Sequence, residues 1–254
     1  MRKSFAIIHF AIHNTISHSL IPAALSILAA SYLFGFFLTQ LIVSGHIRVL
    51  IDYACGAYYL FILLFTFIFV INYFKRLEAN HNYQWLLTSG ISRKSFIMYS
   101  YCAFALIIFL IGLLFFLAAY FWIYYQTGIT VFYLWPSFLI YACEGMVLIA
   151  LATIFAISLS LYVAYFAFLG SYLLCLVNHS WWQTIISKDD SYSKYLQLFI
   201  SYMIPDFKLL DIHAAILYEQ PIDYYSFCAI LIYCSFFSIA ITVFARYLFK
   251  RTAL

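Results

Sequence analysis

"YACGAYYLFILLFTFIFVINYF", residues 53–74, contains no Asp, Glu, Lys or Arg. Asp52 and Lys75 bound this stretch, which is as long as the roughly 20 apolar residues that a helix needs to cross the hydrocarbon core of a membrane. A segment in that core must satisfy its backbone hydrogen bonds internally, as an α-helix does. The stretch therefore predicts a membrane-spanning helix.

The rest of the chain has the same character. Its 254 residues are 67% hydrophobic and 9% charged, and the mean hydropathy is +1.00, whereas soluble domains carry about 25% charged residues. A soluble fold of this length cannot bury so much apolar surface. The composition excludes that class and predicts one all-α integral membrane domain over residues 1–254.

Uncharged stretches set the expected number of spans. Long runs without Asp, Glu, Lys or Arg follow Lys3, Asp52, Lys94, Glu144 and Asp223. Comparing their lengths with that of one crossing predicts six transmembrane helices. They are expected at residues 20–43, 53–74, 96–121, 136–157, 160–178 and 224–246.

The distribution of charge predicts the orientation. If both termini and residues 75–94 are cytoplasmic, nine of the thirteen Lys and Arg residues lie on that side and seven of the nine acids lie opposite. The charges therefore predict that both termini are cytoplasmic, and the membrane we expect is a bacterial inner (cytoplasmic) membrane. Because the cations occur singly or in pairs at helix ends, the formal net charge of +4 indicates contact with membrane lipid and no nucleic-acid partner.

Two further segments flank the expected spans. Residues 1–18 have apolar side chains at helical spacing, which predicts an N-terminal interfacial helix. Residues 179–223 form the expected external region before the last span. Pro205 divides its apolar part into two pieces too short to span, which predicts short interfacial or re-entrant helices, and Asp206 is a candidate N-cap for the second.

The polar interruption "KRLEANHNYQWLLTSGISRK", residues 75–94, carries an apolar stripe. Tyr83, Leu86 and Leu87 fall on one side of a helix, and Ser92 is a candidate cap for the next span. The pattern predicts a short cytoplasmic helix. Such a stripe contacts lipid as readily as a groove on a protein, so the pattern alone leaves both open.

This layout resembles the type-2 ABC transporter permease family. In that family the segment after the second span looks like E-x-G-T-x-E-x-L-L-x-x-P-I-S-R and forms the coupling helix, which sits in a cleft of the ATPase subunit. Here Gln84 stands in place of the second acid and Gly90 in place of the Pro. The matching positions are Leu86, Leu87, Ile91, Ser92 and Arg93, with Glu78 at or near the first acid.

The resemblance implies a function and its partners. It implies an exporter-like permease subunit that contacts an ABC ATPase subunit and a second permease copy or homologue, with an external gate at Pro205 and Asp206. The chain has no G-x-x-x-x-G-K-[ST] phosphate loop, so no cofactor and no enzymatic activity are expected in it, and ATP and Mg²⁺ belong to the partner. The implied ATPase-coupling residues are Glu78, Tyr83, Trp85, Leu86, Leu87 and Arg93.

Glu144 is the one acid inside an expected span. A carboxylate there is costly and is by default a functional-site hypothesis, although a structural role with a Tyr hydroxyl as partner is equally open. The alternative function is a membrane-embedded enzyme or assembly factor, which would need Glu144 to converge with His179 and His213. His9 and His13 are four residues apart near the N-terminus, a spacing that can bind a metal. No third ligand lies nearby, so no metal site is expected.

An aromatic series marks the fifth expected span. Its rings could line a path for a substrate, or they could pack against neighbouring helices, and the sequence allows both. The series consists of Tyr162, Tyr165, Phe166, Phe168 and Tyr172.

Overall fold

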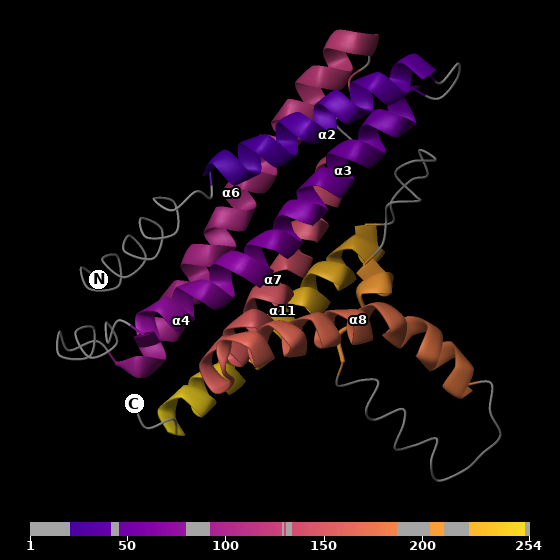
Figure 1. Cartoon of the computed structure of the whole chain (residues 1–254). Helices are drawn as coiled ribbons and strands as arrows, with labels where there is room; N and C mark the ends of the chain where they lie inside the picture. Colours follow the sequence, from indigo (N-terminus) through magenta and orange to yellow (C-terminus); the bar gives the residue numbers. More distant parts are fainter. Residues whose placement is uncertain are drawn as a thin grey trace.

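A computed structural model describes most of the chain. The described residues are 21–41, 46–79, 92–128, 130, 134–186, 204–210 and 224–251. Within them the chain is almost entirely helical and has no strand (Figure 1). The expected interfacial helix over residues 1–18 and most of the expected coupling helix lie outside the described residues.

Five described helices are long and apolar enough to cross a membrane, so the chain is an all-α membrane protein. A further helix, α2, coincides with the first expected span, and its described apolar part is Ser26–Gly35. The elements are α2 (Ile21–Leu41), α3 (His46–Leu64), the π-helix η2 (Phe65–Val70), α4 (Ile71–Ala79), α6 (Arg93–Thr127), α7 (Trp135–Ser158), α8 (Leu161–Ile186), the 3₁₀ turn η4 (Phe207–Leu210) and α11 (Tyr224–Arg251).

Two helices are longer than the apolar runs that predicted them. α3, η2 and α4 form one helix with an apolar span over Arg48–Ala79, which is 32 residues, and the span of α6 covers 33 residues. At about 1.5 Å per residue each approaches 50 Å, against a hydrocarbon core of about 30 Å. Each is therefore longer than the hydrocarbon core is thick.

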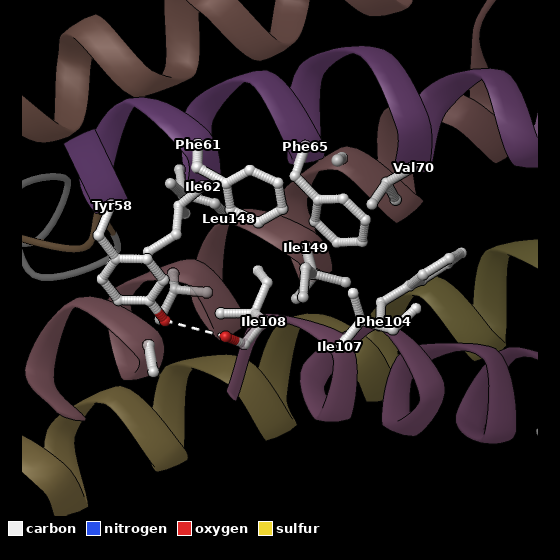
Figure 2. Packing of buried hydrophobic residues seen from close by; sticks show 14 of the residues in the cluster. Tyr58, Phe61, Ile62, Phe65, Val70, Phe104, Ile107, Ile108, Leu148 and Ile149 are labelled. Atoms are coloured by element: carbon white, nitrogen blue, oxygen red, sulfur yellow. Dashed lines mark hydrogen bonds between the residues drawn. The ribbon is translucent and has the colours of Figure 1, made fainter. Parts of the chain in front are cut away.

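The central helix of the bundle is α7. It packs against α11, α6, α3, α4 and α8. Gly145 allows this close approach, since a Cβ there would lie 3.0 Å from Ile62 Cγ2 and 3.1 Å from Ile108 Cδ1. Figure 2 shows the resulting core, whose labelled members are Tyr58, Phe61, Ile62, Phe65 and Val70 on one continuous helix, Phe104, Ile107 and Ile108 on α6, and Leu148 and Ile149 on α7.

Ring contacts define where the helices run side by side. At one end, Phe74 of α4 contacts Phe96 of α6 with 6.4 Å between ring centroids. At the other, Phe138 of α7 lies 5.5 Å from Tyr58 and 5.6 Å from Phe116. The start of α3 and the last turns of α6 therefore project past the start of α7, and α2 joins them at that end of the bundle (Figure 1).

The connection between α7 and α8 is as short as the expected spans at 136–157 and 160–178 imply. α7 ends at Ser158 and α8 begins at Leu161. The amide of Leu159 closes the end of α7 by donating to the Phe155 carbonyl at 3.0 Å. α8 then diverges from the bundle (Figure 1), and its described contacts are mainly with α7, α4 and η4.

The aromatic series on α8 divides between two faces. Tyr165 and Phe168 pack on Phe67, at 4.7 and 6.1 Å between ring centroids. Tyr162 and Phe166 point away, with 75% and 77% of their surface exposed. Part of the series is therefore helix packing, and part is a free aromatic face.

Candidate functional site

Glu144 lies inside the bundle with a tyrosine partner. It is nine residues into α7 and only 4% exposed. The Tyr59 hydroxyl on α3 donates to Glu144 Oε1 at 2.7 Å. A buried carboxylate is strongly destabilising without such a donor. The tyrosine partner considered from the sequence is therefore Tyr59, 85 residues away along the chain.

A second tyrosine extends this contact to a third helix. The hydroxyl oxygens of Tyr59 and Tyr172 are 3.0 Å apart. Tyr59 has one proton and directs it to Glu144, so Tyr172 is the donor in this second bond. Glu144, Tyr59 and Tyr172, which we term the Glu144 cluster, thus connect α7, α3 and α8.

Aromatic rings border the Glu144 cluster. Tyr141 lies 5.4 Å from the Tyr59 ring, and Phe207 lies 6.3 Å from the Tyr172 ring. Tyr59 and Tyr172 are half-buried, whereas Glu144 is buried. The cluster therefore sits at the edge of the packed core. It presents two hydroxyl groups and a carboxylate, which can exchange hydrogen bonds with a polar group.

Residues 204–210, which include the expected gate, are fixed by hydrogen bonds to two helices. Asn178 of α8 donates its side-chain amide to the Ile204 carbonyl at 3.0 Å. The Asp206 amide donates to the Tyr233 hydroxyl of α11 at 2.8 Å. Pro205 and Asp206 are both buried. The segment therefore lies between α8 and α11.

Asp206 caps the described start of the expected second helix. Its Oδ1 accepts a hydrogen bond from the Lys208 amide at 3.0 Å, at the start of the 3₁₀ turn η4. A carboxylate that binds the backbone two residues on is typical of turns. Residues 211–223, which contain the rest of the expected helix, lie outside the described residues.

Two of the expected coupling residues, Glu78 and Arg93, lie at the described ends of the polar segment 75–94. Glu78 is exposed on the last turn of α4, and its Oε2 forms an ion pair with Lys75 Nζ at 2.7 Å. Ser92 caps α6 by accepting from the Ser95 amide at 3.2 Å, which confirms the predicted cap, and Arg93 is the first residue of that helix. The other expected coupling residues, Tyr83, Trp85, Leu86 and Leu87, lie outside the described residues.

Interlocked rings hold together the two helices that flank this segment. Tyr73 contacts Phe104 at 5.1 Å, and Phe74 contacts Phe96 and Phe104 at 6.4 and 6.2 Å. These four side chains, which we term the aromatic clamp, are all at most 5% exposed. The ends of the polar segment are consequently fixed relative to each other.

A π-helix separates the aromatic clamp from the Glu144 cluster. Tyr59 and Lys75 lie on the same continuous helix, sixteen residues or about 24 Å apart. Between them η2 replaces the α-helical hydrogen bonds over six residues. Within it Thr66 Oγ1 is 2.9 Å from the Ile62 carbonyl and 3.0 Å from that of Leu63. The sequence gives no signal for η2, although such segments often occur at functional sites.

Among the residues that the structure covers, no group of three or more His, Cys, Asp and Glu side chains is placed to hold a metal. His179 lies on α8, but its side chain and all of His213 are outside the described part, so their convergence with Glu144 stays a prediction. No family model matches the chain, and no curated protein matches it.

Proposed function

We propose that the chain is the membrane-spanning permease subunit of a type-2, exporter-like ABC transporter. It moves an unidentified substrate, and a separate ATPase subunit hydrolyses the ATP. The observation that carries the proposal is the position of the polar segment 75–94, which joins two long apolar helices whose adjoining ends are held together by the aromatic clamp. A segment held in this way can receive force from a soluble partner.

The continuous helix from Tyr59 to Lys75 provides a path for that force. Movement of the coupling segment displaces α4 and α6 together, because the rings of Phe74, Phe96 and Phe104 interlock. α4 continues through η2 into α3, which carries Tyr59 and its bond to Glu144. The Glu144 cluster lies at the far end of this path and is the site most directly affected.

In this proposal η2 is the deformable joint of the path. A π-turn holds one residue more than an α-turn, so a helix can take up or release that residue without breaking. Thr66 supports the exchange, because its hydroxyl lies within hydrogen-bonding distance of two carbonyls on the preceding turn. In this proposal the exchange of that residue passes a rotation or shift of α4 on to α3 and to Tyr59.

The proposal includes six spans with both termini in the cytoplasm of a bacterial inner membrane. α2 supplies the sixth crossing beside the five longer helices. Residues 204–210 act as a re-entrant segment and external gate, a role supported by the burial of Pro205 and Asp206 and by the bond to Tyr233. A second permease copy or homologue packs along the free aromatic face of α8, where Tyr162 and Phe166 are exposed.

Capture of the ATPase tests the proposal. The tagged chain is purified in mild detergent from its native cells, and the eluate is probed for a soluble ATP-binding protein. Leu86→Glu places a charge on the apolar stripe, and Thr88→Glu places the same charge on the opposite face of the expected helix as the matched control. We expect capture by the native chain and the control, and loss with Leu86→Glu. Failure of the native chain to capture such a protein, or equal capture by both variants, would overturn the proposal.

A further inference from the structure

An apolar pocket opens between α6 and α7, away from the Glu144 cluster. It is lined by one face of α6 between Phe109 and Phe116 and one face of α7 between Trp135 and Ala142, and Tyr58 of α3 also lines it. Its volume is about 270 Å³. Trp135 begins α7, so the pocket lies near one end of that helix and not at its centre.

Two small residues and a fixed phenol create the pocket. Gly112 and Ala142 contribute almost no side-chain volume to its walls. A Cβ on Gly112 would lie 2.6 Å from Tyr58 Cζ, so glycine is needed for the phenol to fit. The Tyr58 hydroxyl donates to the Ile108 carbonyl at 3.0 Å (Figure 2), which satisfies its one proton and holds the ring in place.

The pocket has almost nothing to offer a polar ligand. Apart from the Tyr58 hydroxyl and the Trp135 indole, no lining side chain carries nitrogen or oxygen. Water occupies a cavity only where it finds two to four polar partners, so this pocket is unsuited to water. The occupant must be apolar.

The opening faces the hydrocarbon of the bilayer. Phe109, Leu113 and Trp135 line the pocket and are 53%, 46% and 41% exposed. They belong to helices long and apolar enough to cross a membrane, so the medium around their exposed faces is lipid. Acyl chains are therefore the apolar groups present at high concentration at this opening.

We infer that the pocket binds one acyl chain of a lipid from the leaflet in which α7 begins. Trp135 stands where the headgroup of that lipid would lie, since indole rings prefer the membrane interface. Moving an acyl chain from the bilayer into the pocket gives no hydrophobic gain, because both surroundings are apolar. The affinity comes instead from van der Waals contacts between the chain and the side chains that line the pocket. The inference depends on membrane insertion and is independent of the proposed ATPase coupling.

Retention of lipid by the full purified chain tests the inference. The protein is equilibrated with phosphatidylcholine in detergent micelles, washed with lipid-free detergent, and analysed by native mass spectrometry. Ala142→Phe fills the pocket, and Ala240→Phe makes the same change on the exposed surface of α11. We expect one retained lipid per native chain and per control chain, and about tenfold weaker retention by Ala142→Phe, which corresponds to about 1.4 kcal/mol.

A second variant guards against misfolding. Leu113→Trp covers the opening from a half-exposed position and leaves the back of the pocket unchanged. It should weaken retention as Ala142→Phe does, with native helix content by circular dichroism. Equal retention by the native chain and Leu113→Trp would overturn the inference, as would a native chain that keeps only detergent. If the pocket instead accommodates a second copy of the chain, Leu113→Trp would abolish dimers in the native mass spectrum. That outcome would also contradict the inference.

Discussion

Tyr59 donates a 2.7 Å hydrogen bond to Glu144 and lies on the same continuous helix as Lys75, which begins the polar segment 75–94. The intramembrane carboxylate is therefore joined to the helix that leads to the membrane surface. Tyr172 completes the connection by bringing α8 to the same oxygen of Tyr59 at 3.0 Å. Three helices that are distant in sequence meet at one polar point at the edge of the apolar core.

Removing the central hydroxyl should destabilise the fold more than removing the outer one. Tyr59→Phe leaves Glu144 Oε1 without this donor in a buried position, which costs about 1–3 kcal/mol. Tyr172→Phe removes a bond between two half-buried hydroxyls, for which about 0.5–1.5 kcal/mol is expected. Thermal unfolding in mild detergent should rank the two variants in that order. Equal or reversed losses would mean that Tyr59 does not stabilise the carboxylate.

Ala should destabilise the fold at Gly145 and stabilise it at Gly56. A methyl group on Gly145 requires Ile62 and Ile108 to move, and overpacking of this kind costs about 1–3 kcal/mol, against about 0.5–1 kcal/mol that Ala gains in a helix. Nothing lies within 4 Å of a Cβ on Gly56, so Ala there should stabilise α3 by about 0.5–1 kcal/mol.

The paired unfolding midpoints of Gly145→Ala and Gly56→Ala check this prediction. Opposite shifts relative to the native chain are expected. A lower unfolding midpoint for both variants would indicate that Gly56 of α3 faces a neighbour, such as a second copy.

The positions of the long helices were predictable because charge and hydropathy determine them locally. Asp52 and Lys75 mark the ends of an apolar run, and Ser92 caps the next helix as its hydroxyl chemistry predicts. The helix ends beyond those charges were not predictable, since a backbone that is already helical continues into polar sequence until something stops it. α3 thus begins at His46, seven residues before the expected span.

The hydrogen-bond partners of the polar residues in the spans were harder to predict from the sequence. Glu144 stood out because an acid within a span is rare, but 85 residues separate it from Tyr59, and many tyrosines lie in the spans. Tyr233 and Asn178 were missed for the same reason. A hydroxyl or amide inside a span needs a partner, yet the sequence alone does not say which helix supplies it.

Tyr233 should control the mobility of the expected gate. Tyr233→Phe leaves the Asp206 amide without its acceptor in a buried position. We expect the amides of residues 206–210 to exchange hydrogen at least about tenfold faster, equivalent to about 1.4 kcal/mol of lost protection. Tyr225→Phe is the control, because that side chain is 83% exposed on the first turn of the same helix. Unchanged exchange in Tyr233→Phe would show that the segment is held by its other contacts.

Deletion of one residue should convert η2 to a regular α-helix and uncouple the two ends of the second span. Ile68 is the residue to remove, because it lies within η2 and is 41% exposed. A π-segment of this kind contains one residue more than the α-helix it interrupts, so its loss leaves both flanks in their native orientation. Deleting Leu60 is the matched control, since it is similarly exposed, at 48%, but lies in the α-helical part, where one residue less rotates a flank by about 100°.

The two deletions give opposite signatures. Without Ile68 the chain should keep its helix content, its unfolding midpoint and its capture of the ATPase, while substrate-stimulated ATP hydrolysis falls to the basal rate. Without Leu60 the packing of α3 on α7 should fail and the unfolding midpoint should fall. If substrate still stimulates ATP hydrolysis to the native rate in the Ile68 deletion, the π-helix η2 is not needed to transmit force. If the unfolding midpoint falls as far as it does in the Leu60 deletion, the flanking helices have not kept their register.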